Sequence, residues 1–339
     1  MRNTTIALTN YLPNILIISK SSQDNCYPNV ERLDFMKILL VPGNPGWAFD
    51  YRAKDLLSLK FDEIQVELKY VKKVMPDDKN RYDLIYPMSI NIAKKLHKRT
   101  AIPYNKMATG ITSIRIIDNH TNNHSDEADF VRFLKGFRGI NTSSEEIKDR
   151  LTPYIPIART RVGIDETLFK PLQKRNESER FKVGWVGRID QEDYRQLKGY
   201  DLVLAALKVV DVELDIRTYK DRVPREEMAA FYQQLDCFIC SSASEHIPLP
   251  LLEAAACGVP IISTRVGIAP ELITHNKNGF IVPRTPDAFQ SAVKALMDSP
   301  EKRKKFSKRI RGEVVKHWTL EACKAEWETF FLSLQKRSQ

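Results

Sequence analysis

The chain has 339 residues, of which 42% are hydrophobic and 28% are charged. This composition is that of a folded globular protein, which excludes wholesale disorder, and the length predicts two domains rather than one. The net charge of +10 indicates an anionic partner, but no zinc finger or aromatic-interleaved basic strand accompanies it, so nucleic acid is not expected as a partner.

Residues 1–35 are treated as an N-terminal extension, because the first clear strand pattern is the apolar run at 36–41. The turn after this run contains Gly43 and Gly46, and a helix is predicted at 51–59. A strand, a glycine-bearing turn and a helix in this order are typical of a dinucleotide-type domain. A tight turn that needs a permissive backbone explains the glycines equally well.

The rest of the first half continues this alternation and completes a Rossmann-like domain, predicted to span residues 36–172. Ser144 and Glu145 belong to a capping pattern that predicts a helix ending near Leu151. The polar stretch at 173–180 is predicted to be a linker. The other elements predicted in this half are strands at 64–71, 83–86, 106–111 and 136–141, and helices at 92–97 and 129–134.

The second half restarts the same pattern with continuous apolar strands, which indicates a parallel sheet covered on both faces. We predict a second domain over 173–315 and a terminal helical segment over 316–339 that crosses back to the first domain. The elements predicted here are strands at 182–186, 214–218, 236–241, 259–263 and 279–282, and helices at 201–209, 225–234, 270–274, 287–297, 299–311 and 319–334.

Two carboxylates, Glu245 and Glu253, stand eight positions apart in the most informative stretch of the chain. Pro250 suits the first turn of a helix and Gly258 suits its end, so Glu253 is predicted one turn inside a helix and Glu245 in the loop before it. A helix N-terminus binds anions, and a carboxylate accepts hydrogen bonds from hydroxyls. Together they predict a ligand with phosphates and vicinal hydroxyls, such as a nucleotide sugar.

Two cations are expected to meet this ligand from neighbouring elements. Arg188 follows a strand that ends in Gly187, and Lys198 precedes a helix. Ligands of parallel α/β sheets bind at the carboxyl ends of the strands, where these segments meet. Two cations and free N–H groups are suited to a diphosphate leaving group as charge builds on it.

At these residues the sequence resembles glycosyltransferase family 4, the retaining transferases with the two-domain GT-B fold. The resemblance is close over about 180–300 and holds only in outline at 141–151 and 162–169 of the first half. It implies an α/β fold in which two Rossmann-like domains face a cleft, with 36–172 on the acceptor side and 173–315 binding the nucleotide sugar. The matching pieces are 184–188, 198–199, 245–253, 256–262, 266–273 and 278–282.

The resemblance also implies a role for individual residues. Glu245, Arg188 and Lys198 would form the catalytic set, in which Arg188 and Lys198 hold the donor diphosphate and Glu245 grips the donor sugar. Glu253 would accept hydrogen bonds from the ribose hydroxyls. Further donor contacts are implied at Gly43, Gly46, Gly187, Leu249, Arg222 and Val223.

Each role has a structural alternative. Arg188 could belong to a structural ion pair, Lys198 could be a surface lysine, and Glu253 could be an exposed helix acid.

The sequence also departs from the family. The histidine that often follows a first-half strand is missing at 109–113. His120 and His124 come a few residues later in a polar stretch that is predicted to be a loop with solvated histidines. The segment 210–224 lacks the usual glycine-rich turn.

The predicted function is transfer of a hexose or similar sugar from a nucleoside diphosphate donor to a hydroxyl of a glycan or lipid-linked acceptor. Retention of the anomeric configuration, no metal and no cofactor beyond the donor are implied by the resemblance. The alternatives are a nucleotide-sugar epimerase or phosphorylase with a similar fold, and a non-catalytic sugar-nucleotide-binding protein at a membrane surface. The base, the sugar, the linkage and the oligomeric state are left open.

The five cysteines are an odd, scattered set, which argues against a disulfide framework and for a reducing, cytoplasmic compartment. Cys237 and Cys240 lie in a predicted strand, where residues three apart point to opposite faces.

No apolar run reaches the roughly 18 residues that a membrane span needs. The basic helices at 91–99 and 299–311 predict solvated faces, with contact to an anionic membrane surface as the alternative.

Overall fold

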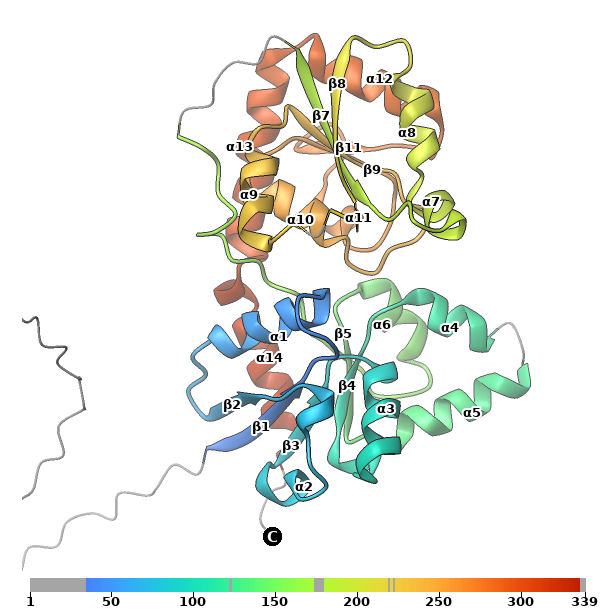
Figure 1. Cartoon of the computed structure of the whole chain (residues 1–339), viewed down its shortest axis with the longest axis vertical. Helices are drawn as coiled ribbons and strands as arrows, with labels where there is room; N and C mark the ends of the chain where they lie inside the picture. Colours follow the sequence, from blue (N-terminus) through green and yellow to red (C-terminus); the bar gives the residue numbers. More distant parts are fainter. Residues whose placement is uncertain (1–34, 122–123, 174–179, 219, 222, 336–339) are drawn as a thin grey trace, which may run out of the picture. The chain divides into compact units, whose positions relative to one another are not determined.

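The computed structural model of this chain is labelled by element in Figure 1. Predictions for the N-terminal extension, for most of the linker and for Arg222 lie outside the residues that it describes. Side chains at 119–126 are also outside the description, including those of His120 and His124. The described residues are 35–121, 124–173, 180–218, 220–221 and 223–335.

The N-terminal lobe, defined here by β1–β6 and their helices, is built on two short parallel sheets in the orders β2-β1-β3 and β4-β5-β6. A parallel bridge between Ile85 and Met107 joins β3 to the segment before β4. Strand β1 is buried along nearly its whole length, as its apolar run predicts. The strands are β1 (Met36–Val41), β2 (Ile64–Leu68), β3 (Leu84–Pro87), β4 (Ala108–Ile111), β5 (Gly139–Thr142) and β6 (Ala158–Arg159).

The helices of this lobe correct one prediction. The polar stretch after 113, expected to be a loop, contains α4 and the start of α5. Ile117, Phe130 and Leu134 are buried, so a helical apolar stripe lies beneath the polar residues. The helices are α1 (Ala48–Ser58), α2 (Asp78–Arg81), α3 (Ile90–Thr100), α4 (Ile114–Thr121), α5 (His124–Lys135) and α6 (Glu145–Leu151), with short 3-10 turns η1 (Val71–Lys73) and η2 (Tyr104–Lys106).

The C-terminal lobe, defined by β7–β11 and α7–α13, holds one five-stranded sheet in the order β11-β10-β9-β7-β8. All of its pairings are parallel, as the continuous apolar strands predict. Cys237 and Cys240 of β9 are buried in separate apolar clusters, which confirms that they face opposite sides of the sheet. The strands are β7 (Phe181–Gly187), β8 (Val212–Thr218), β9 (Cys237–Cys240), β10 (Ile261–Ser263) and β11 (Gly279–Ile281).

Helices pack on both faces of this sheet (Figure 1). The short helix α7, which ends at Lys198, was not predicted, because its apolar content is low and no residue in it is buried. The helices are α7 (Glu192–Lys198), α8 (Tyr200–Leu207), α9 (Arg225–Gln233), α10 (Leu249–Ala256), α11 (Ala269–Leu272), α12 (Pro286–Met297) and α13 (Pro300–His317).

The last helix, α14 (Leu320–Ser333), lies among the elements of the N-terminal lobe (Figure 1). Its Trp327 and Phe331 pack edge-on against Tyr86 of β3, with ring centroids 5.7 and 5.6 Å apart. Trp327 also donates a hydrogen bond of 2.9 Å to the carbonyl of Arg161. The predicted crossing of the C-terminal helix back to the first half is therefore confirmed.

The basic helix α13 uses several of its cations for internal contacts. Arg311 donates to the carbonyls of Phe169 and Ala256, at 2.9 and 2.8 Å, and Arg303 donates to that of Leu296 at 2.6 Å. These guanidinium groups bind helix-end and loop carbonyls. These two arginines of the basic helix therefore have a structural role in this lobe.

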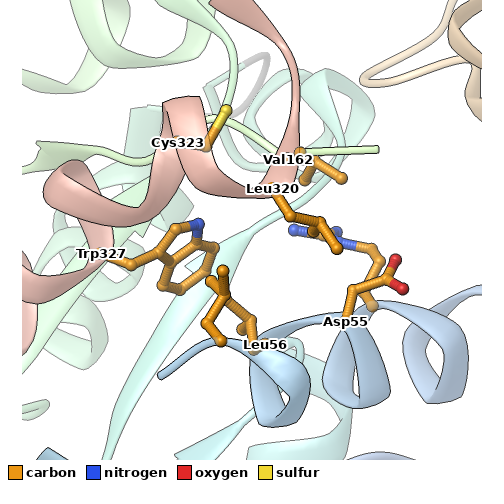
Figure 2. A pocket seen from close by; sticks show the side chains of 9 residues that line it. Asp55, Leu56, Val162, Leu320, Cys323 and Trp327 are labelled. Carbon is orange, nitrogen blue, oxygen red and sulfur yellow. The ribbon is translucent and has the colours of Figure 1, made fainter. Parts of the chain in front are cut away.

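A small cavity of about 10 Å³ lies where α1, α14 and the chain around Val162 meet (Figure 2). Leu56, Leu320 and Trp327 contribute to its wall. This volume holds no more than about one water molecule, so the substrate must bind elsewhere. No helix within the described ranges is both long and apolar enough to span a membrane.

Candidate functional site

Glu245 lies in the loop between β9 and α10, where the sequence predicts it. Its carboxylate accepts a hydrogen bond of 2.7 Å from the Ser242 hydroxyl and forms an ion pair with the ammonium group of Lys198. The two ion-paired side chains are 14% and 23% exposed, so ligand can still reach them. The structure therefore brings together two of the three predicted catalytic residues.

Lys198 reaches Glu245 because the end of α7 packs on the end of β9. The Ser241 hydroxyl donates a hydrogen bond of 2.7 Å to the Lys198 carbonyl. Gly199 follows with φ of 71°, and a Cβ at this position would lie 2.5 Å from the Ser241 carbonyl oxygen. Only glycine meets both demands, which explains the Lys-Gly pair in the sequence.

Arg188 leaves the end of β7 and is held by a nearby acid. Its guanidinium donates to both carboxylate oxygens of Asp190, at 3.0 and 2.7 Å, and lies 3.9 Å from the ring centroid of Tyr194. The bond from Arg188 lowers the pKa of Asp190 below its ordinary value. Gly187 is also required, since a Cβ there would lie 2.4 Å from the Trp185 ring. Arg188 is thus oriented by Asp190, which sequence reasoning did not single out.

Glu253 lies one turn inside α10, as predicted, and is not an exposed helix acid. The Tyr232 hydroxyl donates a hydrogen bond of 2.8 Å to its carboxylate. Burial raises the pKa of Glu253, while the Tyr232 hydrogen bond and the nearby Arg225 charge oppose that rise. Its carboxylate is therefore fixed in direction by a neighbouring helix, α9.

Arg225 connects this group to the N-terminal lobe. It donates to both carboxylate oxygens of Asp55 in α1, at 2.6 and 3.0 Å, and both side chains are at most 13% exposed. Burial raises the pKa of Asp55, and the bonds from Arg225 oppose that rise. A two-pronged pair of this kind fixes geometry as well as charge. No sequence signal links Asp55 to Arg225, because they lie 170 positions apart.

The predicted glycine turn after β1 is shaped by a buried acid. Asp50 accepts hydrogen bonds from the Gly46 N–H, Lys54 and Tyr70 at 2.8 to 2.9 Å. Burial alone would raise the pKa of Asp50, but these bonds outweigh it and lower the pKa. Gly46 has φ of 75°, which favours glycine, whereas at Gly43 a Cβ would only touch Ile92 at 3.6 Å. The turn is therefore explained locally, and donor contacts at Gly43 and Gly46 stay predictions.

The remaining predicted donor contacts lie at the edges of α9 and α10. Val223 is partly buried two residues before α9, and Leu249 begins α10 and is also partly buried. Arg222 lies outside the described residues, so the predicted nucleobase contact rests on Val223 alone. Within the described ranges, no three His, Cys, Asp or Glu side chains form a group that could hold a metal ion.

His246, the residue after Glu245, was not among the predicted site residues. It is 9% exposed, and its Nε2 lies 3.3 Å from the Thr142 hydroxyl at the end of β5. Burial, with a smaller effect of the Arg52 charge, lowers the pKa of His246 to about 3. A neutral imidazole therefore lies beside Glu245 and against the N-terminal lobe.

His246→Gln is expected to make the protein more tolerant of acid. Because the folded-state pKa is about 3 against an ordinary 6.5, unfolding takes up a proton, and stability falls as pH drops from about 6.5 towards 3. Glutamine can still contact Thr142 but does not titrate. The free energy of unfolding, measured with urea, should fall between pH 7 and pH 5 by about 1–2 kcal/mol less in the variant than in the wild type. His317→Gln, at a 39% exposed side chain, is the control. An equal loss in wild type and H246Q would contradict the expectation.

A comparison with protein families shows which proteins this part of the chain resembles. A family model described as "Glycosyl transferases group 1" matches residues 215–313, which include Glu245, Glu253 and α10. Over these residues the chain is similar to the group 1 glycosyl transferases. The group 1 segment thus contains the loop and helix that carry both predicted carboxylates.

Curated relatives resemble the same part of the chain. A D-inositol 3-phosphate glycosyltransferase of Pseudarthrobacter chlorophenolicus is 37% identical over 97 residues, which is 28% of this chain and 23% of that protein. A GDP-mannose-dependent mannosyltransferase of Mycolicibacterium smegmatis is 32% identical over 115 residues, 32% of this chain and 28% of that protein. These alignments span about a quarter of each relative's length.

Solved structures resemble nearly the whole chain. Sucrose-phosphate synthase from Thermosynechococcus elongatus aligns with a TM-score of 0.68 at 14% identity, covering 88% of this chain and 99% of that one. HepE from Anabaena, in complex with UDP and glucose, aligns with a TM-score of 0.67 at 15% identity, covering 88% and 100%. At such identities the likeness shows the fold, and the predicted two-domain GT-B architecture is confirmed.

Proposed function

We propose that this chain transfers a sugar from a nucleoside diphosphate sugar to an acceptor hydroxyl of a glycan or lipid-linked molecule, retaining the anomeric configuration and needing no metal. The observation that carries the proposal is the Lys198–Glu245 ion pair at the end of β9, directly before α10 with its oriented Glu253. Support for the donor class comes from the relative named as GDP-mannose-dependent and from HepE, which is described in complex with UDP-glucose.

The reaction divides between the substrate and these side chains. The bond from the anomeric carbon to the phosphate oxygen breaks, the bond to the acceptor oxygen forms on the same face, and the acceptor proton passes to the departing phosphate. Lys198 leaves Glu245 for the diphosphate and stabilises the charge that builds there. Glu245 then accepts hydrogen bonds from the donor sugar and fixes its anomeric carbon. Arg188, oriented by Asp190, supplies a second cation.

The experiment has a binding step and a turnover step. Thermal unfolding with UDP, GDP or ADP should show a higher melting temperature for one of them, since a ligand that binds only the folded state stabilises it. The matching nucleotide sugars are then tested for nucleoside diphosphate release and for a new glycoside of retained configuration, with and without EDTA. Failure of every nucleotide to bind, together with no release, contradicts the proposal, whereas an epimer or sugar phosphate as product favours the rival enzyme classes.

Tyr232→Phe is expected to make nucleotide affinity more sensitive to acid. The hydrogen bond from Tyr232 lowers the pKa of Glu253, so its removal raises that pKa further above the ordinary value. A protonated Glu253 carries an O–H on one carboxyl oxygen and is a weaker acceptor for the two ribose hydroxyls. As pH falls, the Kd for the nucleoside diphosphate should therefore begin to rise at a higher pH in the variant than in the wild type. Calorimetry from pH 8 to pH 5 measures this Kd.

The matched control is Tyr82→Phe, which removes a hydrogen bond of 2.6 Å from a tyrosine to Glu67 in the N-terminal lobe. Its pH profile should match that of the wild type. Identical profiles for Y232F and wild type would show that Glu253 does not take part in nucleotide binding in its ionised form.

The cytoplasmic location and the contact with an anionic membrane surface also stay proposals. The exposed lysines of α13, Lys304, Lys305, Lys308 and Lys316, are cations available for such a contact. Sedimentation with vesicles that contain anionic lipid, compared with neutral vesicles, is the test.

A further inference from the structure

A pocket of about 470 Å³ opens at the carboxyl edge of the N-terminal sheets. Ser89 lies two residues after the end of β3, and Thr112 directly follows β4. Phe49, near the start of α1, contributes an apolar surface, and Ser113 and Arg115 complete the side formed by the segment that enters α4. In parallel α/β folds, ligands bind at this edge of the sheet.

The lining of this pocket combines polar side chains with the apolar Phe49 and Ile116, and it contains no acidic side chain. Hydroxyls come from Ser89, Thr112 and Ser113, an amide comes from Asn91, and Arg115 is the cation. Arg115 is exposed, and among the residues that the structure describes none forms a hydrogen bond or an ion pair with its guanidinium. Hydroxyl and amide groups suit a polyhydroxylated ligand, and a guanidinium without a carboxylate partner suits a phosphate or a carboxylate.

Contacts across the sheet place this pocket beside the donor residues. Ile111, the residue before Thr112, pairs in register with Thr142 of β5. The Thr142 hydroxyl donates to the Ile111 carbonyl at 3.1 Å and lies 3.3 Å from Nε2 of His246. His246 directly follows Glu245, the residue proposed to fix the donor sugar. A molecule in the pocket therefore lies next to the sugar end of the donor.

We propose that this pocket binds the acceptor, and that the acceptor is a polyhydroxylated molecule carrying an anionic group that Arg115 binds. This inference rests on the proposed function, because it names the substrate of the same site. Arg115 contributes to both the affinity and the orientation of the acceptor. With the anion held at the start of α4, an acceptor hydroxyl is directed towards Thr142 and the donor. An acceptor that lacks the anion keeps only the contacts with hydroxyls and the amide.

Acceptor pairs that differ only in a phosphate provide the test. With the donor that supports release, we compare myo-inositol with its 3-phosphate and glycerol with glycerol 3-phosphate, measuring nucleoside diphosphate formation. The phosphorylated member of a pair should have a kcat/KM at least about tenfold higher. Arg115→Gln should raise its KM about ten- to hundredfold, as expected for loss of a charge-assisted hydrogen bond, and leave the donor KM unchanged. Arg115→Lys, which keeps the charge without the planar fork, should lie between.

The matched control is Arg132→Gln on α5, which removes an exposed arginine whose partner is Asp129. Its kinetics should equal those of the wild type. A vesicle arm with phosphatidylinositol as acceptor decides whether the anionic group belongs to a free molecule or to a lipid headgroup, and activity in either arm that depends on Arg115 supports the inference.

A binding arm separates this inference from the proposed function. Glycerol 3-phosphate should bind the wild type and R132Q, as measured by calorimetry at low salt, and should lose most of its affinity in R115Q. Sugar transfer with equal kcat/KM for charged and neutral acceptors, or with unchanged kinetics in R115Q, overturns the anionic acceptor and leaves the transferase. Absence of any nucleotide binding or release contradicts the transferase, and the calorimetric arm then decides on the anion site alone.

Discussion

Lys198→Met should lower the turnover of sugar transfer about 10²–10³-fold while leaving the fold intact. The ammonium group is the cation that lies directly on Glu245, and it is proposed to stabilise charge on the departing diphosphate, an effect of this size when one such group is removed. Folding should not suffer, because the side chain is 23% exposed and methionine retains its aliphatic length. Steady-state kinetics and circular dichroism measure the two quantities.

Lys182→Met is the control for this variant. Lys182 lies near the other end of β7 and forms an ion pair of 3.0 Å with Glu213, with a comparable exposed fraction of 26%. Its loss should change neither kcat nor KM. Wild-type turnover in K198M would contradict the role of the Lys198–Glu245 pair. Equal losses in both variants would show that removing any such ion pair is damaging.

Gly163→Ala should lower the free energy of unfolding by about 2–4 kcal/mol, because the added methyl group meets backbone that cannot rotate away. A Cβ at Gly163 would lie 2.6 Å from Cα of Leu320 and 2.8 Å from the Thr319 carbonyl oxygen. Backbone hydrogen bonds on either side of this contact tie Ile164 to the start of α14, at 2.8 and 3.1 Å. Relief of the clash must shift α14, whose Trp327 is packed in the N-terminal lobe (Figure 2).

Gly312→Ala provides the comparison for this effect. Gly312 is on α13, it is exposed, and no atom lies within 4 Å of an added Cβ, so alanine should be neutral or stabilise by up to about 1 kcal/mol. Urea unfolding followed by tryptophan fluorescence measures both variants. A midpoint for G163A equal to that of the wild type would mean that the start of α14 moves without a loss in the free energy of unfolding.

Much of the second half could be predicted from local pattern. Buried parallel strands are short continuous apolar runs, and capping residues such as Ser299 and Thr319, which do accept hydrogen bonds from the N–H groups of Lys302 and Ala322, mark where helices begin. The region after 113 was harder, because its polar residues hide a narrow apolar stripe that includes Ile117. Periodicity over so few turns is a weak signal.

Some candidate site residues could be predicted from the local sequence, and others could not. Glu245, Lys198 and Glu253 belong to a contiguous motif or to a turn that only glycine allows, so residue type and spacing were sufficient to select them. Asp190 could have been found as the acid two residues after Arg188. Asp55 could not, because its partner Arg225 lies 170 positions away and is brought to it only by packing.

By itself the sequence determined the alternation of strands and helices, the carboxylates that flank the start of α10, and the glycine at Gly187, since each depends on neighbours within a few residues. The tertiary structure decided which distant side chains meet: Lys198 with Glu245, Arg225 with Asp55, and His246 with Thr142. It also decided that Ser89, Thr112 and Arg115 line one pocket at the carboxyl edge of the N-terminal sheets. The physical reason is that long-range partners depend on how separate elements pack, and local periodicity carries no information about that packing.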